Sequence, residues 1–223
     1  MMYQIKDLQL SLPDMTRKPL LGAAPRIEIL RGLTFDVPQG AVLGIVGGSG
    51  SGKSTLGRAM LRLLEPTGGS ITFNGQDITH LAEDDLRPMR AQMQMIFQDP
   101  MSSLNPRRRV GGIIAGPLHV QGHEGITAKV LEALDMVGLP RSFANRYPHE
   151  LSGGQRQRVG IARAIALRPE FILADEIVSG LDVSSQAQVL NLLQELVREL
   201  GLTLAFISHD MSVIRRLCDR TLV

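Results

Sequence analysis

The chain has 223 residues, of which 43% are hydrophobic and 21% charged, so it has enough apolar side chains for one well-packed domain, and a disordered tail or linker protein is excluded. The formal net charge is only +2, aromatic residues make up 4%, and Trp is absent. A dedicated nucleic-acid binder is therefore not expected, because basic surface and stacking side chains are both scarce.

Cysteine content and hydropathy exclude further kinds of site and classes of protein. Cys218 is the single cysteine, which excludes an internal disulfide or a Cys-rich metal site and favours a reducing compartment. No apolar run approaches the roughly 20 residues of a membrane span, and the first residues lack the apolar core of a signal peptide. We expect a soluble, cytoplasmic protein.

Strands predicted in the first third of the chain are separated by glycine-rich turns. Tyr3–Leu12 alternates loosely between polar and apolar residues, Ala41–Val46 is a continuous apolar run, and Ser70–Phe73 precedes the hairpin signal Asn74–Gly75. Helix formers fill Lys53–Leu64. The order over residues 41–64 is therefore strand, glycine loop and helix.

Residues 99–149 differ in composition from the flanking sequence, because Pro and Gly interrupt Arg-bearing segments. One clear helix is predicted there, near Thr127–Val137, closed by Gly138 and Pro140. We interpret residues 99–149 as an inserted helical subdomain, so that residues 1–98 and 150–223 form one discontinuous core.

Helices and strands alternate again from Ser152. A helix reaches Leu167, the apolar run Phe171–Ala174 follows, and a long helix leads to a second apolar run, Thr203–Ile207. Apolar residues of the long helix recur with the i, i+3, i+4 spacing of one buried face: Val189, Leu192, Leu193, Leu196, Val197 and Leu200. This alternation predicts an α/β fold with a largely parallel sheet covered on both faces.

Residues 47–54 read GGSGSGKS and satisfy the phosphate-loop pattern G-x-x-x-x-G-K-[ST] between a predicted strand and a predicted helix. Glycines suit this chemistry because backbone N–H groups can turn inward around an anion with no Cβ in the way. We expect Lys53 to reach the β- and γ-phosphates of a nucleotide and Ser54 to bind Mg²⁺. The predicted nucleotide-binding residues here are Gly47, Gly48, Ser49, Gly50, Ser51, Gly52, Lys53, Ser54 and Thr55.

Two carboxylates, Asp175 and Glu176, follow the run Phe171–Ala174, at the edge where open α/β sheets bind ligands. We assign Asp175 to the Mg²⁺ shell and Glu176 to orienting or deprotonating the attacking water. By itself a strand ending in Asp-Glu is an ordinary polar terminus. Beside a phosphate loop it is the expected metal partner.

Residues 151–155 read LSGGQ, the signature of ATP-binding cassette ATPases, and with the phosphate loop the sequence resembles that family over nearly its whole length. Ser152 and Gln155 also satisfy a helix capping box. The resemblance implies a P-loop NTPase core with a mostly parallel sheet, an N-terminal antiparallel β subdomain and an inserted α-helical subdomain. It implies that Ser152, Gly153, Gly154 and Gln155 meet the ATP held by a second ATPase subunit, so that hydrolysis of ATP·Mg²⁺ requires a homodimer or heterodimer.

Three further segments match the family. Gln98 resembles the glutamine that senses the γ-phosphate and Mg²⁺, Ser179–Asp182 resembles the loop that crosses the dimer interface, and His209 resembles the switch histidine. The resemblance implies catalytic roles for Glu176, His209, Gln98 and Lys53, nucleotide contact by Asp182, and Mg²⁺ binding by Ser54, Gln98 and Asp175.

The segment Phe97–Arg107 resembles the oligopeptide, dipeptide and nickel importer branch of the family. Membership implies a subunit that powers a binding-protein-dependent importer through ATP-driven dimer closure. Its partners would be integral membrane permease subunits, docked around Asp99–Arg109 at the cytoplasmic face of the membrane, and indirectly a periplasmic or extracellular solute-binding protein. Arg107, Arg108 and Arg109 belong either to that docking surface or to a solvated basic cluster.

The sequence departs from the family at three places. Leu12 stands where an aromatic residue usually stacks on adenine, Ile177 stands where proline is common, and the chain ends at Val223, where a further strand is expected, as in a shortened form or a fragment.

Two alternatives to the importer stay open. One is a soluble ATPase of a non-transport assembly, such as phosphonate degradation. The other is a degenerate partner that binds nucleotide and turns over slowly. The transported solute is not encoded in this chain, because the binding protein and the channel select it.

Overall fold

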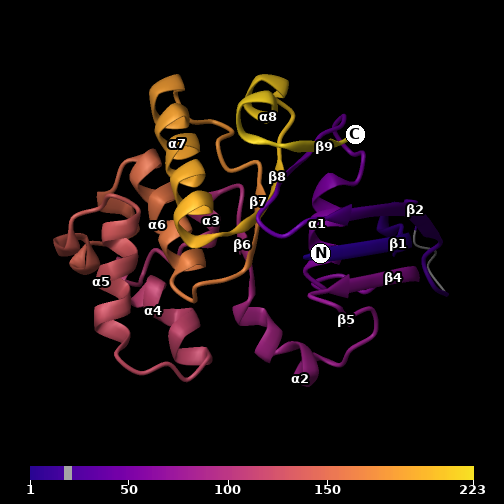
Figure 1. The fold of residues 1–223 in the computed structure, drawn as a ribbon, viewed down its shortest axis with the longest axis horizontal. Coiled ribbons are helices and arrows are strands. Elements are labelled where there is room, and N and C mark those ends of the chain that lie inside the picture. Colours follow the sequence, from indigo (N-terminus) through magenta and orange to yellow (C-terminus); the bar gives the residue numbers. More distant parts are fainter. Residues whose placement is uncertain (18–21) are drawn as a thin grey trace.

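The computed structural model describes residues 1–17 and 22–223 and contains two sheets of different topology (Figure 1). An antiparallel sheet has the order β2-β1-β4-β5 and a parallel sheet has the order β6-β7-β8-β3-β9. The strands are β1 (Tyr3–Pro13), β2 (Arg26–Val37), β3 (Val42–Ile45), β4 (Gly68–Phe73), β5 (Gln76–Asp77), β6 (Met93–Ile96), β7 (Phe171–Asp175), β8 (Thr203–Ile207) and β9 (Arg220–Leu222). The predicted α/β class, with a mostly parallel sheet and an N-terminal antiparallel β part, is confirmed.

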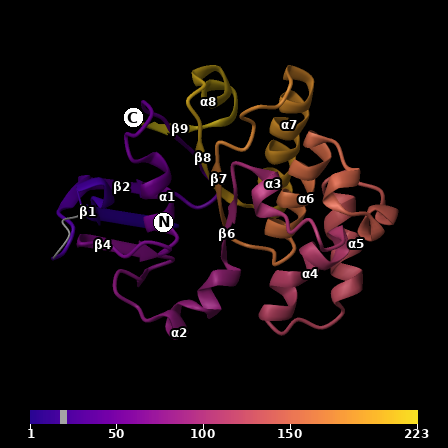
Figure 2. The ribbon, with the colours of Figure 1, turned by 180° about the vertical axis from the view of Figure 1, so that it is seen from behind.

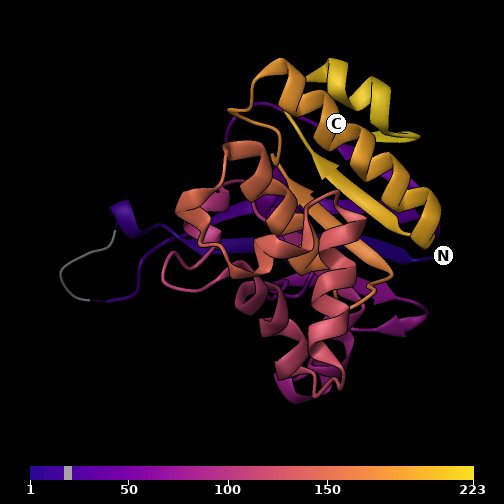
Figure 3. The same cartoon turned by 90° about the vertical axis from the view of Figure 1, so that its left-hand side faces the viewer.

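Helices cover both faces of the parallel sheet. The longer ones are α1 (Lys53–Met60), α4 (Val110–Val120), α5 (Ile126–Met136), α6 (Gly153–Ile165), α7 (Val183–Leu200) and α8 (Met211–Leu217). The short ones are α2 (Glu83–Leu86) and α3 (Pro100–Ser103), with 3-10 turns at Met15–Arg17, Pro88–Ala91, Arg141–Asn145 and Pro148–Glu150. Figures 1 and 2 show α1 beside the antiparallel sheet and α4, α5 and α6 across the parallel strands from it, and Figure 3 shows α7 along those strands.

Each central strand sends alternate side chains into two separate cores. In β7, Ile172 and Ala174 join the core formed with α4 to α8, whereas Phe171 and Leu173 join the core formed with α1 and the antiparallel sheet. The strand β8 divides in the same way. Because both faces are buried, these strands read as unbroken apolar runs in the sequence. The figures and the two cores therefore put α1 and α6 on opposite faces of one sheet.

The stretch predicted as an insertion holds more helix than the sequence indicated. Besides α5, which matches the predicted helix, it contains α3, α4 and two 3-10 turns. Helix α4 was missed because it contains three glycines and Pro117. Its stability comes from burial of Ile113, Ile114 and Leu118, and a Cβ on Gly111 would lie 3.1 Å from the Ala144 carbonyl oxygen. These helices share one core with α6 and α7, and the division at residues 99–149 stays a prediction.

Helix α1 ends at Met60, four residues earlier than predicted. Arg62 has a left-handed backbone, with φ of +52°, and its guanidinium donates to the Ile78 carbonyl at 2.7 Å. The buried Tyr3 hydroxyl donates to the Met60 carbonyl at 3.2 Å, and Arg90 donates to the carbonyls of Leu61 and Arg62. These donors satisfy the free carbonyls of the helix end, so tertiary contacts stop α1 where the propensity alone would continue it.

Strands β2 and β6 were not predicted. β2 carries Gly32 and exposed charges, and β6 is only four residues long with Gln94 inside it, so neither has a strong strand pattern. β9 forms where a further strand was expected and pairs in parallel with β3, Leu43 opposite Arg220. A strand of three residues is too short to have a distinct sequence pattern. Pairing with the central strand β3 is what makes this segment a strand.

Candidate active site

The phosphate loop runs from the end of β3 to the start of α1, as the sequence predicted. A Cβ on Gly47, whose φ is +157°, would lie 2.6 Å from the Ser51 hydroxyl oxygen, so a side chain there would collide with the loop. Gly52 precedes α1 with a left-handed φ of +94°, and no side chain caps the first turn of that helix. Free N–H groups at a helix start and an unobstructed glycine loop are the donor set that phosphates take.

Lys53 lies over this loop. Its ammonium donates to the carbonyl oxygens of Gly47 and Gly48, both at 2.8 Å. The charge is thus held at the loop by neutral acceptors, and a phosphate oxygen would be a stronger partner for it.

Ser54 and Asp175 meet at the same edge of the sheet. The Ser54 hydroxyl donates to Asp175 Oδ1 at 3.0 Å, and Asp175 is only 4% exposed. Burial raises the pKa of the Asp175 carboxyl, and the hydrogen bond from Ser54 offsets part of that shift. A buried carboxylate beside a hydroxyl suits a hard cation such as Mg²⁺, which completes its shell with phosphate oxygens and water. In the part of the chain that is described, three or more His, Cys, Asp or Glu nowhere gather as a metal site.

Glu176 lies at the centre of a second group, which joins the carboxyl ends of three neighbouring strands. Gln98 follows β6 and its Nε2 donates to Glu176 Oε2 at 3.3 Å. His209 follows β8, and its Nδ1 is 3.7 Å from the same oxygen. Parallel strands end at one edge, which is why residues 98, 176 and 209 converge. Glu176 has a left-handed φ of +48°, a strained conformation of the kind that clusters at functional sites.

The signature residues lie elsewhere. Ser152 and Gln155 form the predicted capping box of α6, with the Gln155 N–H donating to the Ser152 hydroxyl at 3.3 Å and the Ser152 N–H donating to Gln155 Oε1 at 3.0 Å. A Cβ on Gly154 would lie 3.5 Å from the Ser185 hydroxyl, and one on Gly153 would lie 3.8 Å from the Leu181 side chain. The signature therefore packs beside the start of α7.

Asp182 is the N-cap of α7 and is part of this second region. Its carboxylate accepts from the Ser185 N–H at 2.9 Å and from the Ser185 hydroxyl at 2.6 Å, and these hydrogen bonds hold the pKa of Asp182 below its usual value. A hollow of about 160 Å³ between Glu176, the loop of residues 178–181 and His209 connects this region to the Glu176 group. Within one chain, the cavities at the phosphate loop are lined by β2, β3, α1 and the last two residues, not by the signature.

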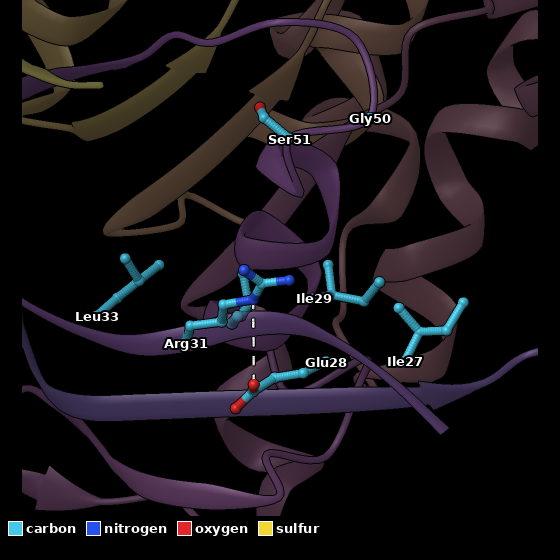
Figure 4. Close-up of a pocket in the computed structure, with 8 residues that line it drawn as sticks. Ile27, Glu28, Ile29, Arg31, Leu33, Gly50 and Ser51 are labelled. Atoms are coloured by element: carbon cyan, nitrogen blue, oxygen red, sulfur yellow. Dashed lines mark ion pairs between the residues drawn. The ribbon is translucent and has the colours of Figure 1, made fainter. Parts of the chain in front are cut away.

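A groove beside the phosphate loop was not found from the sequence. It has a volume of about 490 Å³ and lies between β2 and residues Gly50 and Ser51 (Figure 4). Ile27, Ile29 and Leu33 supply apolar surface to it, and Figure 4 shows Arg31 paired with Glu28, whose Oε2 is 4.0 Å from Arg31 Nε. The apolar residues at alternate positions 27, 29 and 33 were the available signal, and the intervening charges and Gly32 obscured it.

The two atypical residues have structural explanations. Leu12 is half-buried, packs against the core of the antiparallel sheet and pairs with Ile27 across the strands. Ile177 is 1% exposed and anchors the chain after Glu176 in the core shared with α6 and α7. At this position apolar burial, rather than a proline ring, holds the backbone in place.

Comparison with known proteins identifies the chain. A family model described as ABC transporter matches residues 30–179. The chain belongs to the ABC transporter family. It is 51% identical to a putative peptide import ATP-binding protein of Brucella ovis, over 94% of this chain and 70% of the relative. It is 54% identical to the oligopeptide transport ATP-binding protein AppF of Bacillus subtilis, over 87% of this chain and 60% of the relative.

Solved structures agree with this assignment. The ATP-binding cassette MJ0796, in a dimeric post-hydrolysis state bound to ADP and Pi, is similar with a TM-score of 0.82 and 31% identity, over 96% of this chain and 90% of that one. CbiO1 of Clostridium perfringens, part of the complex cbiONQ, also has a TM-score of 0.82, with 27% identity over 98% and 82%. The ABC ATP-binding protein described here is an ATPase, as the family membership establishes. None of the helices within residues 1–17 and 22–223 is both long and apolar enough to span a membrane.

Proposed function

We propose that this chain is the ATP-hydrolysing subunit of an importer that takes up peptides. The observation that carries the proposal is the convergence of Gln98 and His209 on Glu176, next to the phosphate loop and the Ser54–Asp175 pair. Relatives at 51% and 54% identity are named for peptide and oligopeptide transport, which favours the importer over a soluble phosphonate-degrading assembly. Nickel receives no support from those names.

In this proposal each residue has a defined task. The phosphate loop, residues 47–55, holds the phosphates through backbone N–H groups, and Lys53 leaves the Gly47 and Gly48 carbonyls to bind the β- and γ-phosphates. Ser54 and Asp175 would hold Mg²⁺, with Gln98 approaching from β6. When bound, the ion neutralises charge that develops on the phosphate oxygens.

Glu176 would act on the attacking water. Its carboxylate accepts a hydrogen bond from that water, orients it and takes its proton as the water oxygen bonds to the γ-phosphorus and the bond from that phosphorus to the β–γ bridging oxygen breaks, releasing ADP. Gln98 and His209 fix the carboxylate from two sides, at 3.3 and 3.7 Å. The assembled group also favours an active enzyme over the degenerate nucleotide-binding partner.

The signature residues Ser152 to Gln155 and Asp182 would serve the nucleotide of a second subunit. α6 lies on the face of the sheet opposite α1, so a single chain does not offer the signature to its own phosphate loop. The similar cassette MJ0796 is dimeric in two solved structures. We infer that a homodimer or heterodimer closes on two ATP molecules.

We assign the β2 groove to the nucleotide base. It adjoins Gly50 and Ser51 of the phosphate loop and presents Ile27, Ile29 and Leu33. Aliphatic contact would replace the aromatic stacking that Leu12 cannot provide.

Membrane partners would dock at a groove of about 200 Å³ next to Gln98. Leu63 and Phe97 line it and are 50% and 42% exposed, an unusual amount for large apolar side chains beside an active site. This position lies close to the predicted docking segment Asp99–Arg109. It favours peripheral attachment through permease subunits, and we place the protein at the cytoplasmic face, with a solute-binding protein as indirect partner.

Two measurements test the function. The purified chain should release phosphate from ATP with Mg²⁺, and Lys53→Ala should weaken nucleotide binding roughly a hundredfold, since it removes a charge-assisted contact. Reconstituted with its permease subunits and binding protein, the chain should hydrolyse ATP faster when peptides are added. Equal stimulation by nickel salts alone, or none by any peptide, would contradict the proposed cargo while leaving the ATPase intact.

A further inference from the structure

Arg163 contacts the chain on both sides of Gln98. It lies in the last turn of α6, the helix that begins at the signature. Its guanidinium carbon is 5.6 Å from the centroid of the Phe97 ring, and its Nη1 donates to the Ser103 carbonyl oxygen at 2.6 Å. Phe97 immediately precedes Gln98, and Ser103 ends the short helix α3 that follows it.

These contacts are the ones that compensate a half-buried charge. Arg163 belongs to no ion pair among the described residues, and burial lowers the pKa of its guanidinium. A cation that loses hydration needs acceptors, and here they are a ring face and a backbone carbonyl. Only a planar guanidinium can stack on the ring and donate in its plane at the same time, which a lysine ammonium does not do.

We propose that Arg163 is a positioning residue that fixes the Gln98 segment for hydrolysis, which rests on the proposed role of the Glu176 group. Arg163 holds the segment that carries Gln98 at both of its ends. The Gln98 and Glu176 side chains are in marginal contact, at 3.3 Å. A small displacement of the segment therefore breaks the contact. Reacting groups tolerate little misplacement. Loss of the Arg163 contacts therefore reduces the rate of ATP hydrolysis without changing the phosphate loop.

Arg163 also connects three parts of the molecule: the groove next to Gln98, helix α6 and the segment that carries Gln98. Arg163 and Phe97 line the groove next to Gln98, and α6 carries the signature at its other end. One side chain therefore contacts the groove, belongs to α6 and holds the segment that carries Gln98.

The test is a double-mutant cycle with Arg163→Met and Gln98→Ala, measured as kcat for ATP hydrolysis and as nucleotide affinity. We expect Arg163→Met to lower kcat about tenfold or more while nucleotide affinity stays within about twofold. In the Gln98→Ala background the same substitution should have almost no effect, because the residue acts through Gln98. Arg163→Lys should recover only part of the rate. Arg158→Met is the matched control, since Arg158 lies on the same helix and also donates to a backbone carbonyl, that of Val137, and it should keep the wild-type kcat.

Multiplicative losses in the double variant, or an unchanged kcat in Arg163→Met, would overturn the proposal. If Arg163→Met does not fold, Phe97→Leu, which removes the ring face, and Arg163→Lys carry the same cycle with Gln98→Ala. A wild-type chain that releases no phosphate would instead refute the hydrolytic function itself, so the two failures are distinguishable.

Discussion

The two halves of the candidate site differ in how their polar groups are satisfied. On the phosphate side, the buried Asp175 has the neutral hydroxyl of Ser54 as its hydrogen-bond partner, and Glu176 has a strained backbone. On the signature side, Ser152 and Asp182 are exposed, and each caps the helix that it begins. The phosphate side therefore holds a buried carboxylate whose cost a bound cation would lower, next to a strained backbone, whereas the signature side is stable by itself and presents a helix start to a partner. Substitutions on the two sides should accordingly have different effects on nucleotide binding, the rate of hydrolysis and the stability of the fold.

The largest effect is expected on the phosphate side. Glu176→Gln should lower kcat about a thousandfold, because the amide cannot take the proton of the attacking water. Nucleotide binding should persist, and the variant should accumulate as an ATP-bound dimer in size-exclusion chromatography. Wild-type turnover in this variant would remove Glu176 from the reaction.

A smaller effect is expected on the signature side. Ser152→Ala should lower kcat roughly tenfold by removing a donor to the partner's nucleotide. It should leave nucleotide binding by the monomer unchanged and cost about 1 kcal/mol of unfolding free energy through the lost helix cap. Isothermal titration, turnover and thermal melts measure the three quantities. Weakened binding in the monomer would show that the signature serves its own chain's nucleotide.

The β2 groove allows a milder test. Ile27 is 47% exposed, so Ile27→Ala should scarcely change the melting temperature. It should weaken binding of ATP about threefold through lost apolar contact, and weaken GTP equally, because an aliphatic surface does not read the polar edge of a purine. Val120→Ala, an exposed position on α4, serves as control. Unchanged affinity in Ile27→Ala would place the base elsewhere.

The smallest effects are changes in stability with pH, and they should have opposite signs on the two sides. The pKa of Asp175 is raised in the folded state, so its charged form destabilises the protein above that pKa and the penalty disappears as pH falls through it. Asp175→Asn should raise the melting temperature of the nucleotide-free protein at neutral pH, and the gain should shrink in acid.

Asp182 provides the matching case. Its pKa is lowered, so its contribution is present above the unfolded-state pKa and is lost as pH falls through the folded-state value. Asp182→Ala should therefore lower the melting temperature at neutral pH, and the difference should narrow in acid. Melting curves between pH 3 and 7 compare the two variants. The same sign for both would contradict the contrast between the two sides.

The local part of the site could be predicted because its signals are local. A glycine loop between a strand and a helix, and a serine three residues before a glutamine, have geometries set within a few residues. The β2 groove and helix α4 were missed for the opposite reason. Gly32 and Pro117 weaken the local patterns, and burial against residues far along the chain stabilises both elements.

The sequence by itself determined the phosphate loop, the apolar central strands and the capped signature, since backbone freedom, hydrophobic periodicity and helix capping act over short distances. Only the tertiary structure decided that Gln98 and His209 meet at the carboxylate of Glu176. It alone also decided that α1 stops at Met60 and that Arg163 holds the chain on both sides of Gln98. Those contacts join residues dozens of positions apart, and the order of strands in a sheet, which no short-range pattern encodes, is what brings them together.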